Sequence, residues 1–454
     1  MRIHFIAVGG SAMHNLAIAL HLKEYHVTGS DDYIFEPSKS RLDKYGLLPD
    51  SFGWDSSRIT NDIDFVILGM HAKVENIELI EAQNKKLKIV SYPEFIYEMS
   101  KNKTRVVIGG SHGKTSITAM VLHVLNDNGK EVDFMVGAQL EGFETMVHLT
   151  DENDFILLEG DEYLSSPIDR RPKFHLYKPN IALLSGISWD HINVFPTKEI
   201  YLKQFELFLE TIVSGGVLVY NKLDKKVNQI TENCTRSIRK LEYSMPDYFI
   251  DNDISFLKTN EGDLPLKIFG EHNLSNLVGA KLICQLMGVY EEEFNHSITS
   301  FKGADKRLES ILEMSDRSVI KDFAHSPSKV IATTKALKNQ FKSRKLIALL
   351  ELHTFSSLNE EFIVEYKDTL KSADRAILFY DPKAVKIKGL KNINDQKIKN
   401  AFNDDDLLVF SDSEALKDFL LSQSYNNTNL LLMSSGNYAS LDLDYITSQI
   451  KVSQ

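Results

Sequence analysis

At 454 residues the chain is too long for a single hydrophobic core, and at about 100 to 200 residues per domain three domains are expected. The net charge of -11 excludes a dominant nucleic-acid partner, because binding to a phosphate backbone needs a basic face. The two cysteines, Cys234 and Cys284, support neither a disulfide framework nor a zinc site. The N-terminus lacks signal-peptide features and no stretch reaches about 18 apolar residues, so a cytoplasmic protein with no membrane partner is expected.

The first 100 residues alternate strand and helix signals. An apolar run at 3–8 is followed by Gly9 and Gly10 and then by a helical pattern, and further strands are predicted over 26–30 and 64–68. Ligands of parallel sheets bind at the carboxyl ends of the strands, so this glycine turn is a candidate for binding a pyrophosphate, and Asp31 for a ribose hydroxyl. A tight turn and a surface aspartate are equally consistent with these residues.

The middle of the chain begins after a polar stretch at 100–104 that is typical of a linker. Strand and helix signals then alternate again and become weaker over 243–266, where short strands and turns are expected, and another α/β unit starts near residue 310. The strands predicted in these parts are 106–108, 155–158, 181–184, 318–320, 346–350, 375–379 and 429–433, and the helices are 115–126 and 200–213.

This alternation predicts an α/β fold with parallel sheets. We expect three domains, a Rossmann-like domain at 1–100, a P-loop domain at 101–309 and a second Rossmann-like domain at 310–454.

The strongest motif lies between the predicted strand 106–108 and the following helix. It consists of Gly110, Ser111, His112, Gly113, Lys114, Thr115 and Ser116. Glycines allow backbone N–H groups to surround phosphates, the lysine adds a positive charge, and the threonine hydroxyl can bind Mg²⁺. Ile108 stands where a complete Walker A motif has its first glycine, but strand, loop and helix coincide. The sequence therefore predicts an ATP phosphate site here.

Acidic or basic side chains follow two later strands of the same part. Glu159 ends the apolar strand 155–158, where a carboxylate beside a phosphate loop is well placed to hold Mg²⁺. Asp190 and His191 follow the strand 181–184, and from the residues alone His191 is more typical of a structural histidine than of a ligand.

In their order along the chain, these motifs resemble those of the Mur ligases. The matches are His-Phe-Ile-Ala-Val-Gly-Gly at 4–10, Gly-Ser-Asp at 29–31, Gly-Ser-His-Gly-Lys-Thr at 110–115, Leu-Glu-Gly-Asp-Glu-Tyr at 158–163, Trp-Asp-His at 189–191, Gly-Glu-His-Asn-Leu-Ser-Asn at 270–276, Lys-Arg-Leu-Glu at 306–309 and Asp-Phe-Ala-His-Ser-Pro at 322–327. The resemblance thus spans nearly the whole chain.

The resemblance implies an ATP- and Mg²⁺-dependent ligase that activates a carboxylate as an acyl phosphate and then forms an amide bond with an amine. Within the family the sequence is most similar to the murein peptide ligases, which attach L-Ala-γ-D-Glu-meso-diaminopimelate to UDP-N-acetylmuramate in peptidoglycan recycling. The pointers are residues 161–163, 169–174 and 322–327. The alternative is the related UDP-N-acetylmuramate:L-alanine ligase of peptidoglycan synthesis. A monomer or homodimer is expected.

The resemblance also implies roles for residues at matching positions. Lys114, Glu159, His191 and Arg307 would be catalytic, with Thr115, Glu159 and His191 as metal ligands. The rest of the nucleotide site would include Asn273, Asn276, Arg307, Asp322 and His325. The first domain would hold the UDP-sugar through Gly9, Gly10, Ser11, Met13, Ser30, Asp31 and Asn76.

Several positions depart from the family pattern. Ala7 replaces the first glycine of the N-terminal turn, Gly186 stands where many relatives have asparagine, Ser188 stands where they have an acid, and Ser326 replaces a histidine. The stretch 351–357 also lacks the arginines of relatives. A noncatalytic sensor that binds nucleotide and UDP-sugar on the ligase fold therefore stays open as an alternative of another class.

Overall fold

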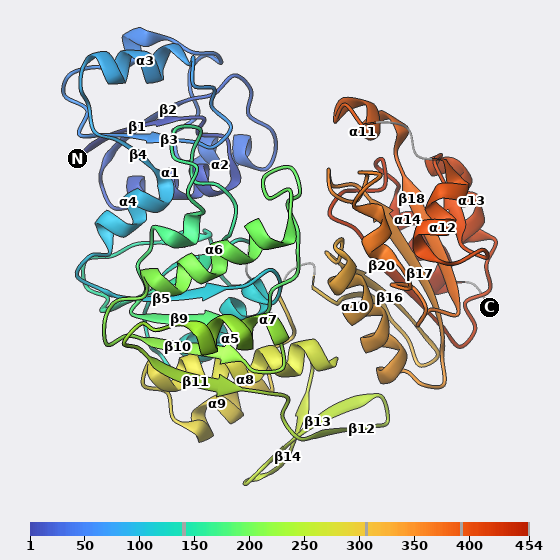
Figure 1. Cartoon of the computed structure of the whole chain (residues 1–454). Helices are drawn as coiled ribbons and strands as arrows, with labels where there is room; N and C mark the ends of the chain where they lie inside the picture. Colours follow the sequence, from blue (N-terminus) through green and yellow to red (C-terminus); the bar gives the residue numbers. More distant parts are fainter. Residues whose placement is uncertain (139–141, 305–306, 391–393, 453–454) are drawn as a thin grey trace. The chain divides into compact units, whose positions relative to one another are not determined.

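The computed structural model describes residues 1–138, 142–304, 307–390 and 394–452 (Figure 1). Contacts between residues divide the chain into two compact units, which are described separately. Unit 1 contains 1–187, 202–243 and 279–291, and unit 2 contains 188–201, 244–278 and 292–454. The domain limits expected from the sequence stay predictions.

The N-terminal part of unit 1 is a four-stranded parallel sheet in the order β2-β1-β3-β4. Its strands are β1 (Arg2–Ile6), β2 (His26–Ser30), β3 (Phe65–Leu68) and β4 (Ile89–Ser91), and its helices are α1 (Ser11–Leu22), α2 (Ser38–Lys44), η1 (Ser56–Arg58), α3 (Ile77–Asn84) and α4 (Tyr92–Met99). The start of α4 is fixed by a capping box, in which Ser91 and Glu94 satisfy each other's backbone N–H groups. Strands β2 and β3 flank β1, so three strand ends meet at one edge.

A seven-stranded sheet forms the other part of unit 1, in the order β11-β10-β9-β5-β8-β6-β7, and only the β6–β7 pair is antiparallel. Its strands are β5 (Thr104–Gly109), β6 (Asp133–Met135), β7 (Val147–His148), β8 (Phe155–Gly160), β9 (Ile181–Leu184), β10 (Val217–Asn221) and β11 (Arg239–Tyr243). The helices of this stretch of chain are α5 (Lys114–Asp127), η2 (Lys173–His175), α6 (Lys198–Thr211), α7 (Lys225–Asn233), α8 (Glu271–Leu286) and α9 (Glu291–Ile298). The central strand β5 lies between β8 and β9, so the loops after these three strands share one edge.

The two sheets of unit 1 are connected by contacts around β7. Asn15 of α1 accepts a hydrogen bond from the Met146 N–H at 3.0 Å. Arg41 donates to the Glu144 carbonyl at 2.7 Å, and Tyr45 donates to the Glu144 carboxylate at 2.6 Å. The position of the N-terminal sheet within unit 1 is therefore fixed by polar contacts.

Unit 2 contains a three-stranded antiparallel sheet, β12 (Tyr248–Asp251), β13 (Ile254–Thr259) and β14 (Gly262–Leu266). A six-stranded sheet follows in the order β15-β16-β20-β17-β18-β19, parallel except for the β15–β16 pair. Its strands are β15 (Glu309–Glu313), β16 (Arg317–Asp322), β17 (Lys345–Leu352), β18 (Arg375–Tyr380), β19 (Leu408–Phe410) and β20 (Thr428–Met433). Its helices are α10 (Pro327–Gln340), η3 (Ile363–Tyr366), α11 (Pro382–Ile387), α12 (Asp395–Phe402), α13 (Ser413–Leu421) and α14 (Leu443–Val452).

The structure confirms the predicted α/β fold with parallel sheets. Alternate residues of β17 belong to two separate buried clusters, Leu350 to one and Leu349 to the other, so both faces of the six-stranded sheet are covered. Cys284 is buried in α8, whereas Cys234 at the end of α7 is partly exposed. Throughout the described residues, every helix is too short or too polar for a membrane span.

Candidate nucleotide and sugar sites

The predicted phosphate loop connects β5 to α5. Gly110 and Gly113 have φ angles of 136° and 82°, a region that other residues rarely adopt. A Cβ on Gly110 would also collide with the Ser185 hydroxyl. The Ser111 N–H donates to the Gly186 carbonyl at 2.9 Å, which ties the loop to the segment after β9. The two glycines therefore give the loop the tight turn that phosphate binding needs.

Lys114 is the first residue of α5, and its ammonium group is held inside the loop. It donates to the Gly110 carbonyl and contacts the Glu162 carboxylate at 2.5 Å, and these two side chains are 13% and 2% exposed. Burial acts to lower the pKa of Lys114, but the carboxylates of Glu162, Asp161 and Glu159 outweigh it and raise the pKa. The Lys114 side chain is therefore positively charged and forms an ion pair with the Glu162 carboxylate.

Thr115 and Glu159 meet at the same sheet edge. The Thr115 hydroxyl donates to Glu159 Oε1 at 2.9 Å, and the Gly137 N–H donates to Oε2 at 2.8 Å. A Cβ on Gly137 would lie 2.8 Å from Oε1, so the glycine makes room for the carboxylate. A hydroxyl beside a carboxylate fits Mg²⁺, which prefers oxygen ligands and usually keeps several waters.

A complete metal cage of protein side chains is not formed. Within the described ranges, no three His, Cys, Asp or Glu side chains are grouped so that they could hold a metal ion. Thr115 and Glu159 lie in unit 1, whereas His191 lies in unit 2. The fit with Mg²⁺ thus depends on phosphate and water oxygens as further ligands.

His191 follows the buried Asp190 and has a φ angle of 56°. The His191 N–H donates to Asp190 Oδ1 at 2.7 Å, and Asp190 Oδ2 lies 3.9 Å from His325 Nε2. Burial lowers the pKa of His325, and the nearby Lys329 lowers it further, so the His325 ring is neutral. Unit 2 thus brings together two predicted site residues, His325 and the Asp190–His191 pair.

Arg307 lies two residues before β15, and Asp322 ends the neighbouring strand β16 in unit 2. The Asp322 carboxylate accepts hydrogen bonds from the N–H groups of Leu308 at 2.8 Å and Ala324 at 2.6 Å. Burial raises the pKa of Asp322, although Arg307 and these hydrogen bonds oppose the rise. The Arg307 guanidinium lies 4.8 Å from the centre of the Phe323 ring. Lys306, which precedes it in the motif, lies outside the described residues.

Asn273 and Asn276 are both buried near the start of α8. Asn273 Nδ2 donates to the Phe269 carbonyl at 3.0 Å, so its side chain shapes the N-terminal turn of the helix. Directly before it, Gly270, Glu271 and His272 line a cavity of about 240 Å³ in unit 2. Other lining residues include Tyr248, Ser328, Lys335 and Gln340.

The N-terminal glycine turn is hydrogen-bonded to Asp31. The Gly9 N–H donates to Asp31 Oδ2 at 2.8 Å, and the Asp31 carbonyl accepts from the Gly53 N–H at 2.8 Å. Burial, helped by the neighbouring Asp32, raises the pKa of Asp31 to about 6. Ser11 begins α1 just after Gly10, whereas the Met13 side chain is buried.

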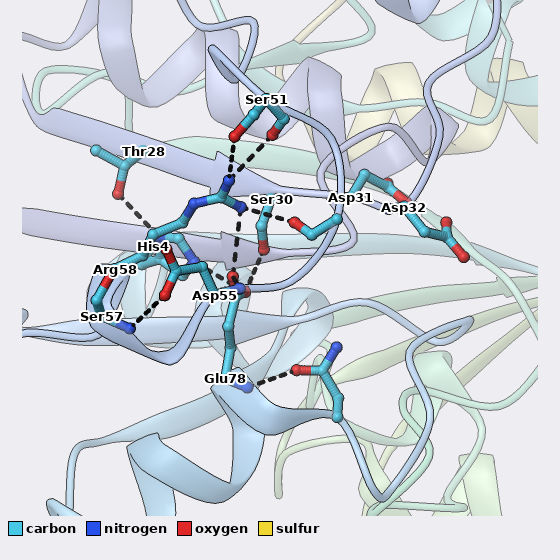
Figure 2. A network of polar contacts seen from close by, with 12 residues as sticks. His4, Thr28, Ser30, Asp31, Asp32, Ser51, Asp55, Ser57, Arg58 and Glu78 are labelled. Carbon is cyan, nitrogen blue, oxygen red and sulfur yellow. Dashed lines mark hydrogen bonds and ion pairs between the residues drawn. The ribbon is translucent and has the colours of Figure 1, made fainter.

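Ser30 and Asn76 take part in contacts within the protein (Figure 2). The Ser30 hydroxyl donates to the buried Glu78 carboxylate. Asn76 caps α3 by accepting from the N–H groups of Glu78 at 2.9 Å and Leu79 at 3.1 Å. These contacts use the hydroxyl group of Ser30 and the Oδ1 atom of Asn76, and the predicted roles of both residues with substrate stay predictions.

Two buried carboxylates that contact candidate site residues were not singled out by the sequence analysis. Glu162, the partner of Lys114, lies within the motif at 158–163, for which the sequence indicated no role of this residue. Its position two residues after the end of β8 is a signal that could have identified it. Glu78, which connects β2 to a distant loop, lies at the start of α3 and carries no local sign of its contacts. Only the fold brings its partners together.

Three family models match consecutive parts of the chain. They are the Mur ligase family catalytic domain over 2–104, the Mur ligase middle domain over 108–284, and the Mur ligase glutamate ligase domain over 306–436. A UDP-N-acetylmuramate–L-alanine ligase of Sulfurihydrogenibium sp. is 30% identical over 368 residues, 80% of this chain and 78% of the relative. The chain belongs to the Mur ligase family. It is therefore an ATP-dependent ligase that forms an amide bond.

Relatives of this Mur ligase are named for two different reactions. A UDP-N-acetylmuramate–L-alanyl-γ-D-glutamyl-meso-2,6-diaminoheptandioate ligase of Haemophilus influenzae is 26% identical over 453 residues, 97% of both chains. Among solved structures, a murein peptide ligase from Psychrobacter arcticus has a TM-score of 0.67 at 20% identity over 100% of both chains. A UDP-N-acetylmuramate-alanine ligase from Thermotoga maritima has a TM-score of 0.70 at 19% identity over 99% and 98%. Both structures share the fold of this chain.

Proposed function

We propose that this Mur ligase joins the tripeptide L-Ala-γ-D-Glu-meso-diaminopimelate to the lactyl carboxylate of UDP-N-acetylmuramate. The observation that carries this choice is the Haemophilus relative named for that reaction, which matches this chain over 97% of both lengths. A second candidate is L-alanine as acceptor, favoured by the 30% identical relative over 80% of this chain. Both reactions act on peptidoglycan precursors and use the same nucleotide chemistry.

The phosphate loop is the proposed site of ATP with Mg²⁺. Bound ATP would supply the phosphoryl group that converts the poorly electrophilic carboxylate into an acyl phosphate. Lys114 would offset negative charge on the phosphates, and the Thr115 hydroxyl and Glu159 carboxylate would hold the cation. The charged state of Lys114 and the Thr115–Glu159 contact at 2.9 Å support these roles.

Roles with the nucleotide are also proposed for residues of unit 2, from their positions in the family motifs. Arg307 would offset phosphate charge, and His191 would be a further metal ligand. The remaining contacts would come from Asn273 and Asn276 for the base and from Asp322 and His325 for the ribose and phosphates. What supports these roles is the position of the residues in the family motifs.

The four-stranded sheet is the proposed site of the UDP-sugar. Gly9 and Gly10 would meet the pyrophosphate where α1 begins, and Asp31 would accept from a ribose hydroxyl. The Gly9–Asp31 hydrogen bond at 2.8 Å supports a shared site. We also propose the domain limits 1–100, 101–309 and 310–454, and a monomer or homodimer in the cytoplasm.

The test is phosphate release from ATP and Mg²⁺ with UDP-N-acetylmuramate, comparing the tripeptide with L-alanine. Release that depends on the tripeptide supports the proposal, and the ligated product is identified by its mass. Preference for L-alanine would replace the tripeptide with the second candidate. No release with either acceptor, despite binding of UDP-N-acetylmuramate, would favour a noncatalytic sensor. Lys114→Ala is the inactive control.

A further inference from the structure

Three exposed aromatic rings gather on the N-terminal sheet of unit 1. Tyr33, Phe35 and Phe52 are 57%, 72% and 42% exposed. The Tyr33 ring lies 4.5 Å from Phe35 and 5.8 Å from Phe52, measured between ring centres. A single exposed apolar residue needs no explanation, but a cluster of exposed rings is typical of a binding surface.

This aromatic cluster adjoins Asp31 from two separate parts of the chain. Tyr33 and Phe35 follow Asp31 after the end of β2, whereas Phe52 precedes Gly53, whose N–H donates to the Asp31 carbonyl at 2.8 Å. Both segments that carry the rings are therefore connected directly to Asp31, the residue proposed to bind the ribose.

The loop that carries Phe52 is held by a polar network (Figure 2). Arg58 donates to the carbonyls of Gly53 at 2.8 Å and Ser51 at 3.0 Å, one on each side of Phe52. The Glu78 carboxylate, which is fully buried, accepts from the Asp55 N–H at 2.9 Å and lies 3.5 Å from Arg58.

The same carboxylate also fixes the other segment. Its second oxygen accepts from the Ser30 hydroxyl and lies 3.4 Å from His4 Nε2 (Figure 2). Burial alone would raise the pKa of Glu78, but His4, Asp55 and Ser30 outweigh it and lower the pKa. One ionised side chain thus connects the end of β2 to the loop of Phe52.

We propose that Tyr33, Phe35 and Phe52 form the surface on which the pyrimidine base of the UDP-sugar stacks, and that Glu78 positions this surface through Ser30, Asp55 and Arg58. The inference rests on the proposed function. Ribose lies between pyrophosphate and base, so a ligand with pyrophosphate at Gly9 and ribose at Asp31 extends its base beyond Asp31. Flat aromatic faces bind bases by stacking.

The first test replaces Phe52 by Ala and by Tyr and measures the KM values for UDP-N-acetylmuramate and for ATP. We expect Phe52→Ala to raise the KM for the UDP-sugar roughly 5- to 100-fold, with the ATP KM and kcat within about twofold. Phe52→Tyr keeps the ring and should stay near wild type. Tyr290→Ala, which removes another exposed aromatic side chain, is the matched control and should change neither KM.

A direct binding measurement uses UDP alone, which carries the base, ribose and pyrophosphate without the sugar. The calorimetric Kd for UDP should rise with Phe52→Ala and Tyr33→Ala by the same factor as the KM. An unchanged Kd in both variants would overturn the stacking surface. So would variants that turn a wild-type dimer into a monomer at unchanged Kd, because the rings would then serve a second copy of this chain.

The second test addresses Glu78 as a positioning residue. Glu78→Gln removes the charge and should raise the KM for UDP-N-acetylmuramate about tenfold at unchanged kcat. Arg58→Met, which keeps Glu78 in place, should have the same effect if Glu78→Gln does not fold. The matched control is Thr28→Val, which removes the 2.9 Å contact of His4 with Thr28 but leaves the loop contacts intact.

If Glu78 had a merely structural role, Glu78→Gln, Arg58→Met and the control Thr28→Val would all lower the melting temperature. The KM for UDP-N-acetylmuramate would then be the same in the first two variants as in the control. That result would contradict the positioning role. If wild-type protein binds neither UDP nor UDP-N-acetylmuramate, the proposed function fails, whereas wild-type binding with unaffected aromatic variants refutes only this inference.

Discussion

The His112 ring lies where a side chain at residue 186 would stand. A Cβ placed on Gly186 would be 2.5 Å from His112 Nε2 and 3.2 Å from Asp224 Oδ2. The φ angle of Gly186 is not in the left-handed region, so it is space and not backbone conformation that excludes a larger residue. This relationship gives a physical reason for glycine at position 186.

We expect Gly186→Ala to lower the free energy of unfolding by about 1 to 3 kcal/mol, because the new methyl group must displace the His112 ring. The KM for ATP should rise as well, since Gly186 is bonded to the phosphate loop through Ser111. Chemical denaturation of the single variants and of His112→Ser/Gly186→Ala measures the coupling. The double variant should recover at least about 1 kcal/mol, and simple additivity would contradict the steric explanation.

Lys114→Ala should reduce kcat by at least about 100-fold, because the loss of one donor that stabilises charge in the transition state typically has an effect of this size. It should also lower the free energy of unfolding by about 3 kcal/mol, because the Glu162 carboxylate would stay buried without its partner. Lys114→Ala/Glu162→Gln separates the two effects. The double variant should regain stability but not phosphate release, and recovery of turnover would remove Lys114 from the mechanism.

Asp31 should make stability depend on pH. Its pKa in the fold, about 6, is above the ordinary value of 3.8, so the fold favours the protonated form. The stabilising contribution is complete below the ordinary pKa and is lost as the pH rises through about 6. At pH 7.5 Asp31→Asn should therefore be more stable than wild type by about 1 to 3 kcal/mol, with no such gain at pH 3.5.

Urea unfolding of both proteins across this pH range checks the expectation. Parallel stability curves would contradict the raised pKa. If Asp31 also accepts from the ribose, the KM for UDP-N-acetylmuramate should rise in Asp31→Asn even where its stability increases. Ser11→Ala, at the start of α1, provides a variant of the same proposed site that leaves the Gly9–Asp31 hydrogen bond unchanged.

Ala7 has a φ angle of 67°, which lies in the left-handed region that favours glycine. The alanine that replaces the glycine of the family pattern therefore keeps a glycine-like backbone conformation. The left-handed conformation costs a non-glycine residue about 1 to 2 kcal/mol, and glycine loses about 0.5 to 1 kcal/mol through its more flexible unfolded state. Ala7→Gly should therefore leave stability unchanged or raise it by up to about 1 kcal/mol. Ala7→Val should lower it by at least about 2 kcal/mol, because a β-branched side chain fits the left-handed region poorly. Thermal melting should show a loss of stability for Ala7→Val and none for Ala7→Gly.

The elements with strong apolar patterns were predictable from the sequence. The expected strand 155–158 lies within β8 (Phe155–Gly160), and the expected helix 115–126 lies within α5 (Lys114–Asp127). Both have many buried apolar side chains, which produce a clear periodicity. The weak pattern over 243–266 correctly indicated short strands and turns, because its strands are half exposed and lie in a small antiparallel sheet.

The candidate site was predictable only where its residues are neighbours in the chain. The loop around Lys114 was found because backbone turn, charge and hydroxyl occur in one motif. Its partner Glu162 and the support of Glu159 by Gly137 depend on strand pairing, in which β8 lies beside β5 and β6. The Glu78 network joins residues from 4 to 78, and no local pattern encodes such contacts.

The unequal exposure of the two cysteines makes one of them a natural attachment point. Cys284 is buried in α8, and burial raises the pKa of its thiol, so the reactive thiolate is scarce there. A maleimide dye added to the native protein should therefore attach at Cys234 alone. A spectroscopic reporter can thus be placed at the end of α7 without any engineering of the chain.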